Sequence, residues 1–469
     1  MSEKQPSKKI DNIRQSTFER SMALFQMTLS GGAKYAGVKW GGLFRDKSKQ
    51  EDAYTQFLID QAERVVRELG KLKGSVMKAG QMLSVYGEHF FPPQINQILK
   101  NLQSDSEPVS WSQMEKVLLR GMGKEKLAEL EIDPEPIGAA SMGQVYRGTI
   151  KKTGQVVAIK VQYPGVDQAI DSDLKALKMM LNVTSLVPKG PSFDSIFREI
   201  RMMLHYETDF RRELNNMLHY RELLQNDSRF VIATPFPEYC SNRILVMSFE
   251  EGYSLDSNQV EHISQARKNL LGAAILELMY KEIFEWRQVQ TDPHFGNYKV
   301  RLDPTHGDQI ILFDFGAVRQ FPKKYIQPFA ELVYYAIRQD TEKVITAGNN
   351  LGFLRDTDDQ RSLDLFRTIC FTAAEGFAEE YASPSLDGSD PGPNPYCWGE
   401  TSLFEKLSQL GKNAVFTFKL RPPPREAIFM DRKMVGTYFI AAKLQLQMGP
   451  RRLMLKYLEP YISEESSPQ

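Results

Sequence analysis

The strongest constraint on the fold of this chain is a β-hairpin pattern inside a sequence that otherwise has the periodicity of helices. β-Branched residues cluster at Val145–Ile150 and Val156–Val161, and the turn-forming stretch Lys151–Gly154 lies between the two runs. A further strand is expected at residues 243–248. Elsewhere apolar residues recur at spacings of three and four, as in residues 54–86 and 196–217, which predicts amphipathic helices.

The charge balance argues against a dedicated nucleic-acid binder. The 469 residues include 59 Lys and Arg and 59 Asp and Glu, so there is no overall basic excess. The excess is local, because residues 1–50 carry ten basic and four acidic side chains, a net charge of +6. An apolar, glycine-punctuated stretch at residues 21–40 fits either an amphipathic segment on a membrane surface or a leader that docks on the rest of the protein.

Cysteine usage and hydropathy indicate a protein of a reducing compartment. The three cysteines, Cys240, Cys370 and Cys397, are far apart, which argues against a disulfide framework and a cysteine-based zinc site. The longest uncharged runs, residues 21–33 and 89–99, are shorter than the roughly 20 residues needed to cross a bilayer. We expect an intracellular, cytoplasmic protein with peripheral membrane association as an option, and the basic start also leaves organelle targeting open.

Charged and polar side chains occupy notable positions on the predicted helices. Lys78 and Gln81 are three residues apart, so they point the same way from a helix, and Gly80 beside them permits another backbone to come close. Glu207 falls on the apolar stripe of residues 196–217. A carboxylate at a buried position is costly without a partner, so we expect Glu207 to contact a lysine.

Four sequence pieces in a fixed order point to phosphoryl transfer. The small residues of Gly138–Val145, at a strand–turn–strand, would let backbone amides approach phosphates. Lys160, near the end of an apolar strand, is suited to pairing with α- and β-phosphates. Asp292 and Asn297 lie five residues apart, and Asp314 opens D-F-G after an apolar run. Such a site needs one carboxylate to orient or deprotonate the nucleophile, and an amide oxygen plus a second carboxylate to hold Mg²⁺ at the phosphates.

These motifs resemble those of the UbiB family of atypical protein-kinase-like proteins, also called AarF-domain kinases. The resemblance spans roughly residues 55–450 and rests on K-x-G-Q at Lys78–Gln81, an alanine-rich loop, E-x-D at Glu207–Asp209, D-P-x-x-G-N and D-F-G. It implies an α+β, two-lobed kinase-like fold with a small β-rich N-lobe, a helical C-lobe and an N-terminal helical K-x-G-Q extension. The extension would cover the site where ordinary kinases bind peptide, with Lys78 directed at the nucleotide pocket.

The resemblance also implies cofactors and site residues. ATP and Mg²⁺ would bind, with Mn²⁺ as an alternative metal. Lys160 would contact phosphates, Asp292 would be the catalytic carboxylate, and Asn297 and Asp314 would hold the metal. The nucleotide-binding residues would be those of the small-residue loop, the phosphate-binding lysine and a hinge that meets adenine: Gly138, Ala139, Ala140, Ser141, Gly143, Val145, Lys160, Ser248, Phe249, Glu250 and Glu251. The regulatory K-x-G-Q and E-x-D residues would be Lys78, Gly80, Gln81, Glu207 and Asp209.

The chain departs from related patterns in several places. Gly138 stands where alanine is common in the family, and Gln290 and Thr291 precede Asp292 where ordinary kinases have His-Arg. Only residues 317–322 separate D-F-G from the next helical segment, and no A-P-E follows. The activation segment on which peptide kinases seat their substrate is therefore lacking, which argues against a conventional protein kinase.

Spacing leaves the carboxylate partner of Lys160 open. Glu207 lies on the buried stripe, and Glu213 is the alternative. The six histidines show no metal-ligand spacing, so His294 is interpreted as a structural neighbour of Asp292 rather than a zinc ligand.

The predicted organisation has four parts. They are a basic, partly apolar segment (1–50), a helical K-x-G-Q extension (51–130), a kinase-like N-lobe with inserted helices (131–252), and a helical C-lobe (253–469) with a proline- and glycine-rich loop at 383–399.

The function implied by the resemblance is a magnesium-dependent, atypical kinase-like ATPase that supports ubiquinone or related prenyl-lipid biosynthesis at a membrane surface. The phosphoryl acceptor would be water or an unknown hydroxyl. Expected partners are the nucleotide and membrane-peripheral proteins of prenyl-lipid or ubiquinone biosynthesis, with no nucleic acid. The alternatives are a small-molecule or lipid kinase, and a non-catalytic module in which ATP switches the binding of a lipid or a partner.

Overall fold

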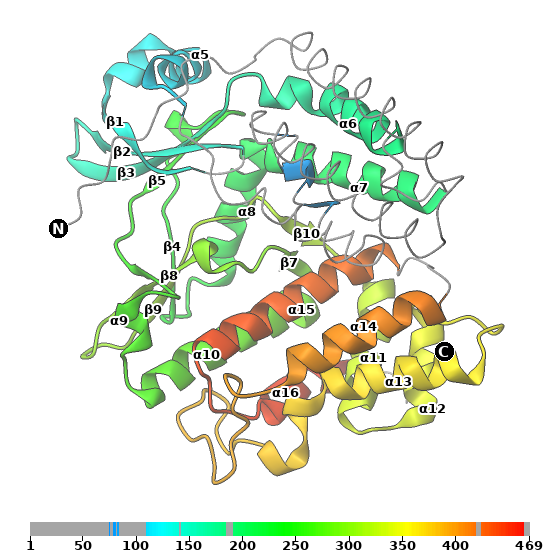
Figure 1. The fold of residues 1–469 in the computed structure, drawn as a ribbon. Helices are drawn as coiled ribbons and strands as arrows, with labels where there is room; N and C mark the ends of the chain where they lie inside the picture. Colours follow the sequence, from blue (N-terminus) through cyan, green and yellow to red (C-terminus); the bar gives the residue numbers. More distant parts are fainter. Residues whose placement is uncertain are drawn as a thin grey trace, which may run out of the picture. The chain divides into compact units, whose positions relative to one another are not determined.

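The computed structural model describes residues 75, 78–80, 82–83, 109–139, 142–183, 191–418 and 424–463. Its chain forms two compact units. The first unit comprises the chain up to Asn215 together with Thr234–Phe249, and the second comprises Asn216–Ala233 together with the chain from Glu250 onward. Figure 1 labels the elements of both units. The segment predicted at residues 1–50 and most of the K-x-G-Q extension lie outside the described residues.

The first unit is built on a four-stranded antiparallel sheet, shown mainly in cyan in Figure 1. Its strand order is β1-β2-β3-β5, with β1 at Leu130–Ala139, β2 at Gly143–Ile150, β3 at Gln155–Gln162 and β5 at Ile244–Ser248. The predicted hairpin is confirmed as β2 and β3. Its turn ends at Gly154, whose positive φ of 72° favours glycine.

Four helices accompany this sheet: α5 (Trp111–Ala128), α6 (Val166–Val183), α7 (Pro191–Glu207) and α8 (Phe210–Leu223), of which α8 continues into the second unit. The apolar periodicity of residues 196–217 does not correspond to one uninterrupted helix. The break falls at Thr208 and Asp209, where the Asp209 side chain accepts a hydrogen bond from the Arg212 amide at 3.0 Å. Asp209 thereby acts as an N-cap that starts α8 afresh.

The second unit contains two small sheets. A four-stranded sheet has the order β4-β9-β8-β6, with β4 at Phe230–Ile232, β9 at Gln309–Leu312, β8 at Tyr298–Arg301 and β6 at Tyr253–Ser254. β4 runs parallel to β9, and the other pairs are antiparallel. A separate antiparallel pair joins β7 (Gln288–Gln290) to β10 (Val318–Gln320).

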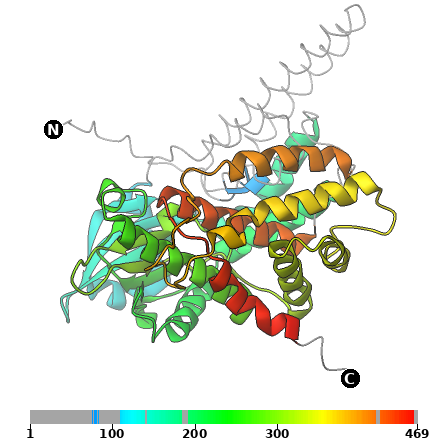
Figure 2. The same cartoon turned by 90° about the horizontal axis from the view of Figure 1, so that it is seen from below.

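Helices make up most of the second unit: α9 (Asn258–Glu261), α10 (Gln265–Tyr280), α11 (Lys323–Ile337), α12 (Thr341–Asn350), α13 (Gln360–Ala373), α14 (Leu403–Thr417), α15 (Arg425–Lys443) and α16 (Arg451–Ser463). α10 is central, because every residue from Leu271 to Tyr280 is buried. The last helix, α16, packs against α10 and α11 and is the red helix of Figure 2. No described helix is long and apolar enough to span a bilayer.

α10 does not end as an ordinary α-helix. It continues into a π-helical turn at Lys281–Glu285, closed by a 2.8 Å hydrogen bond from the Trp286 amide to the Lys281 carbonyl. π-Turns carry one extra residue per turn and often occur near functional sites.

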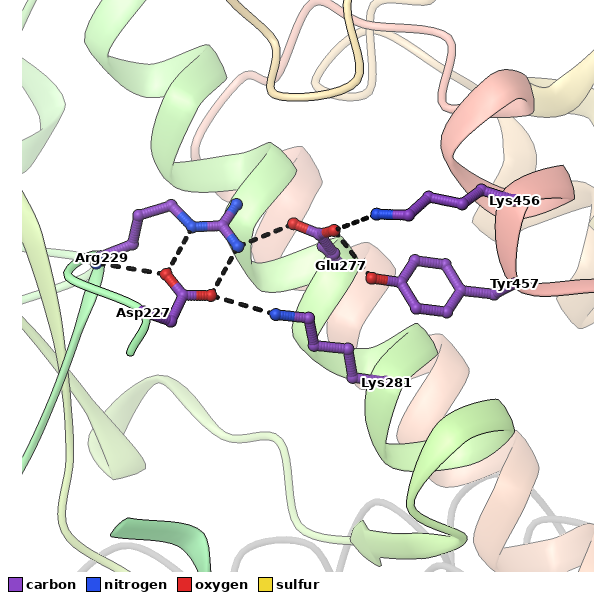
Figure 3. Close-up of polar contacts among 6 residues, drawn as sticks. All are labelled: Asp227, Arg229, Glu277, Lys281, Lys456 and Tyr457. Atoms are coloured by element: carbon purple, nitrogen blue, oxygen red, sulfur yellow. Dashed lines mark hydrogen bonds and ion pairs between the residues drawn. The ribbon is translucent and has the colours of Figure 1, made fainter. Parts of the chain in front are cut away.

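A network of charged side chains joins α10 and α16 to the segment between α8 and β4 (Figure 3). Arg229 donates two hydrogen bonds to the Asp227 carboxylate, of 2.8 and 2.7 Å. Its guanidinium also lies 2.7 Å from Glu277 on α10. Lys281 contacts Asp227 at 3.1 Å, and the Tyr457 hydroxyl of α16 donates to Glu277 at 2.7 Å. Burial opposes ionisation of Asp227, but the hydrogen bonds from Arg229 and Lys281 outweigh it and lower its pKa.

Candidate functional site

Lys160 lies in the centre of the first unit's sheet, opposite Val145 on β2 and Leu245 on β5. Its Nζ is 2.8 and 2.9 Å from the two carboxylate oxygens of Glu213 on α8. The Glu213 side chain is only 1% exposed and that of Lys160 13% exposed, so the pair is largely withdrawn from water. The structure thus pairs Lys160 with Glu213, one of the two partners that spacing left open.

Glu207 instead pairs with the lysine of K-x-G-Q. Lys78 Nζ lies 3.0 Å from Glu207 Oε1, and both side chains are mostly buried. The expectation that Glu207 contacts a lysine is therefore confirmed. Gly80 is buried, while Gln81 lies outside the described residues. Ser75, one turn before Lys78, donates to the buried Asp173 of α6, so this short helical piece contacts both α6 and the end of α7.

The small-residue loop connects β1 to β2. Gly138 and Ala139 are exposed at the end of β1, whereas Ala140 and Ser141 lie outside the described residues. An added Cβ at Gly138 would meet no atom within 4 Å, but one at Gly143 would lie 2.3 Å from the Val161 carbonyl oxygen. The close approach of β2 and β3 therefore requires glycine at position 143 and not at 138.

The residues of the expected hinge fall at the division between the units. Ser248 ends β5, where its hydroxyl accepts from the Thr234 amide at 2.8 Å, and the Phe249 amide donates to Val156 at 3.1 Å. Glu250 begins the next part of the second unit and accepts from Arg301 at 2.6 Å, while Glu251 is exposed.

Strand register gathers the chemistry-bearing residues of the second unit. In the β8–β9 pair Tyr298 lies opposite Leu312. Asn297 directly precedes Tyr298, and Asp314 follows Leu312 by two residues, so both emerge at the same end of this sheet. In the β7–β10 pair Gln290 lies opposite Val318, which brings the chain just after β7, where Asp292 lies, beside the residues that follow D-F-G.

Asp292 is held from three directions. Arg432 Nη2 on α15 donates to its Oδ1 at 2.6 Å, and its amide donates to Gln290 Oε1 at 2.5 Å. Its carbonyl accepts from the Asn297 side-chain amide at 2.9 Å and from the His294 amide at the same distance. His294 Nδ1 accepts from the Gly296 amide, which fits the interpretation of this histidine as a structural neighbour.

Arg432 was missed by sequence reasoning, because it lies 140 residues after Asp292. Its helix lies directly against the Asp292 loop, since a Cβ added at Gly436, one turn further along α15, would be 2.8 Å from the Pro293 carbonyl oxygen. The only sequence signal was a basic Arg432–Lys433 pair within a helix that is otherwise partly apolar.

Asp314 is tied to its surroundings through both main chain and side chain. Its Oδ1 accepts from the Gly316 amide at 3.1 Å, and its carbonyl accepts from Gln290 Nε2 at 3.1 Å. The following Phe315 is 1% exposed and packs on the Tyr220 ring with 4.9 Å between centroids. These contacts fix the position of D-F-G within the second unit.

The oxygen donors available here fit Mg²⁺. The NH₂ group of Asn297 is engaged with the Asp292 carbonyl, which turns its amide oxygen away from that contact. An amide oxygen and the Asp314 carboxylate are hard ligands of the kind Mg²⁺ accepts, and this ion commonly completes its shell with water and phosphate. No cluster of three or more His, Cys, Asp or Glu side chains able to hold a metal occurs among the described residues.

A buried ion pair lies next to Gln290, because one of its members contacts the Gln290 main chain. Lys433 on α15 contacts Glu282 of the π-helical turn, and the two side chains are 2% and 1% exposed. Glu282 also accepts from the Tyr220 hydroxyl at 2.9 Å and from the Gln290 amide at 3.3 Å. Burial raises the pKa of Glu282, an effect that Lys433 and Tyr220 oppose.

Comparison with known proteins assigns the chain to a family. A model described as the ABC1 atypical kinase-like domain matches residues 101–347. The chain is 30% identical over 403 residues to the mitochondrial atypical kinase COQ8B of Danio rerio, covering 85% of this chain and 61% of that protein. It is also 30% identical over 383 residues to the mitochondrial atypical kinase COQ8 of Saccharomyces cerevisiae, covering 81% of this chain and 73% of the yeast protein.

A solved structure shows the same fold. The Mycobacterium tuberculosis protein Rv3197, determined in complex with erythromycin, superposes with a TM-score of 0.57 at 20% identity, covering 87% of this chain and 98% of the other. Together with the matched kinase-like domain, this likeness confirms the predicted α+β, kinase-like fold, with a β-sheet in the first unit and a mostly helical second unit. By its matched domain and its relatives, the chain belongs to the ABC1 atypical kinase-like family, which is the UbiB family that its motifs resemble.

Proposed function

We propose that this protein is a magnesium-dependent, atypical kinase-like ATPase that supports ubiquinone or related prenyl-lipid biosynthesis at a membrane surface. The observation that carries the proposal is the convergence of Asp292, Asn297 and Asp314 in the second unit through strand register and the hydrogen bonds of Gln290. One carboxylate for the nucleophile and two oxygen donors for the metal are what phosphoryl transfer requires.

In the proposed mechanism each group has one task. Lys160, held by Glu213, binds phosphate oxygens of ATP. Asn297 and Asp314 hold Mg²⁺, which neutralises charge on the phosphates when it is bound. Asp292, oriented by Arg432, positions water or an acceptor hydroxyl.

The short connection after D-F-G favours water or a small acceptor over a peptide. α11 begins at Lys323, so only residues 317–322 follow Gly316 before it, and β10 occupies half of them. A segment of this length has no room for the extended platform that peptide kinases use. The names of the relatives add a mitochondrial location and the coenzyme Q context to the proposal.

The test is ATP turnover by the purified protein with Mg²⁺, with and without liposomes that contain anionic lipid. We expect ATP turnover to rise with liposomes. We also expect it to require Asp292, so the Asp292→Asn variant should lose it. Asp364→Asn, at a half-exposed aspartate on α13, serves as the matched control and retains turnover.

Labelled ATP separates the alternatives. Label recovered in a lipid or small-molecule extract would replace the ATPase by a kinase for that class of acceptor. Full complementation of a deletion strain by Asp292→Asn, with normal nucleotide binding, would replace it by an ATP-switched binding module.

A further inference from the structure

Gln290 connects the two loops of the second unit that carry the proposed catalytic and metal-binding residues. Its Oε1 accepts from the Asp292 amide at 2.5 Å, and its Nε2 donates to the Asp314 carbonyl at 3.1 Å. It is the last residue of β7 and only 6% exposed. One planar side chain thus fixes the main chain of D-P-x-x-G-N and the main chain of D-F-G at the same time.

This double contact needs an amide. A glutamine offers a donor and an acceptor on one rigid group, whereas a glutamate offers acceptors only and a methionine offers neither at comparable strength. The position is the one at which ordinary kinases carry the histidine of His-Arg-Asp. The departure in sequence therefore keeps a side chain that can both donate and accept.

The main chain of Gln290 is itself held in place. Its main-chain amide donates to Glu282 Oε1 at 3.3 Å, and strand pairing sets the residue opposite Val318. Glu282 is fixed by Lys433 and by the Tyr220 hydroxyl, all within the buried part of the second unit. Because the main chain of Gln290 is anchored in this way, its side chain can position the two loops that it contacts.

We propose that Gln290 is a positioning residue that couples Asp292 to the metal ligand Asp314, so that the affinity for Mg²⁺ depends on its side-chain amide. This inference rests on the proposed function. Hydrogen bonds behind a metal ligand commonly contribute 10- to 100-fold in metal affinity or activity, and the loss of the Nε2 contact would release the Asp314 main chain.

The experiment compares Gln290→Met, which removes both contacts, with Gln290→Glu, which keeps an acceptor for the Asp292 amide and removes the donor to Asp314. The first readout is the Mg²⁺ midpoint, the Mg²⁺ concentration at which ADP produces half of its maximal increase in the melting temperature of the full chain. The second is ATP turnover at saturating Mg²⁺. The matched control is Gln327→Met, whose amide likewise donates to a carbonyl, that of Tyr461, at 2.8 Å.

Both variants should raise the Mg²⁺ midpoint, by about 10- to 100-fold. At saturating Mg²⁺, Gln290→Glu should recover more turnover than Gln290→Met, because it retains the contact that positions Asp292. The control should leave the midpoint unchanged.

A midpoint within about twofold of wild type in Gln290→Glu would overturn the positioning role, and so would an equal shift in Gln327→Met. Should Gln290→Met fail to fold, Gln290→Glu alone decides, since it keeps the size of the native side chain. A wild-type chain that shows no Mg²⁺-dependent response to ADP overturns the proposed function, which is a distinct result.

Discussion

Arg432 donates a 2.6 Å hydrogen bond to the carboxylate of Asp292, joining the C-terminal part of the chain to the loop with the proposed catalytic residue. The bond spans 140 residues of sequence, and the two side chains are about equally exposed, at 27% and 26%. A contact of this kind ties the orientation of Asp292 to the placement of α15.

Replacing Arg432 by Gln should lower ATP turnover by up to about 100-fold with little change in the KM for ATP. The reason is that a reacting group displaced by about 1 Å can lose that much rate without loss of substrate binding. Steady-state kinetics check the split, and Arg338→Gln, an exposed arginine at the end of α11, is the control. Unchanged or faster turnover would show that the ion pair does not orient Asp292 for reaction.

Replacing Glu213 by Gln should weaken turnover more than the same change at Glu207. Glu213 binds Lys160 with both oxygens, and an amide can accept only one of these bonds without the attraction of opposite charges. The double variant with Lys160→Met should be no worse than Lys160→Met alone, because residues in one pair are not additive. Equal effects at Glu213 and Glu207 would contradict the assignment of the pair.

Removing Lys78 should change how the protein handles nucleotide. Lys78→Ala frees Glu207 from its 3.0 Å partner, and we expect either raised autophosphorylation or a shifted preference between ADP and ATP. Phosphate incorporation from labelled ATP and nucleotide-dependent thermal shifts measure the two effects. If neither quantity differs from wild type, Lys78 has no regulatory role.

Alanine at the two glycines of the small-residue loop should have opposite consequences for stability. Gly143→Ala should cost ~1–3 kcal/mol in the free energy of unfolding, because its Cβ would overlap the Val161 carbonyl. Gly138→Ala should leave stability unchanged or slightly improved, since the site is open and alanine restricts the unfolded chain. Urea unfolding compares the two, and a loss at 138 without one at 143 would refute the close packing of β2 on β3 as the cause.

The charged network of Figure 3 should make stability fall in acid. Asp227 and Glu277 both have lowered pKa values, through hydrogen bonds that outweigh their burial. A carboxyl with a depressed folded-state pKa contributes stability above its unfolded value, near pH 4, and loses that contribution as the pH falls further.

Asp227→Asn should therefore flatten the acid limb of a plot of unfolding free energy against pH. Lys456→Ala should not, because Lys456 is half exposed and contributes one 3.2 Å contact at the edge of the network. An unaltered acid limb in Asp227→Asn would mean that other carboxylates set it.

Local sequence patterns predicted those parts of the molecule whose structure depends on interactions between residues close in the sequence. The hairpin followed from β-branched runs around a glycine turn. The motifs around Asn297 and Asp314, the proposed metal ligands, flank two paired strands, whose register brings both residues to one end of the sheet. The partner of Lys160 could not be foretold, because Asp209 caps α8 and interrupts the helical register on which a choice between the carboxylates would depend. Arg432 and the role of Gln290 depend on contacts made only after folding, so no spacing revealed them.

The π-helical turn at Lys281–Glu285 determines how this part of the chain tolerates changes of length. Two consecutive side chains of this turn make separate ion pairs, with Lys281 contacting Asp227 and Glu282 contacting Lys433. Deleting one residue here would restore ordinary α-helical winding and rotate the preceding helix by about 100° relative to the chain beyond the turn. The helix could then keep only one of the two ion pairs. Sequences that descend from this one should therefore keep the length of this turn, and substitutions within it should preserve the charges at positions 281 and 282.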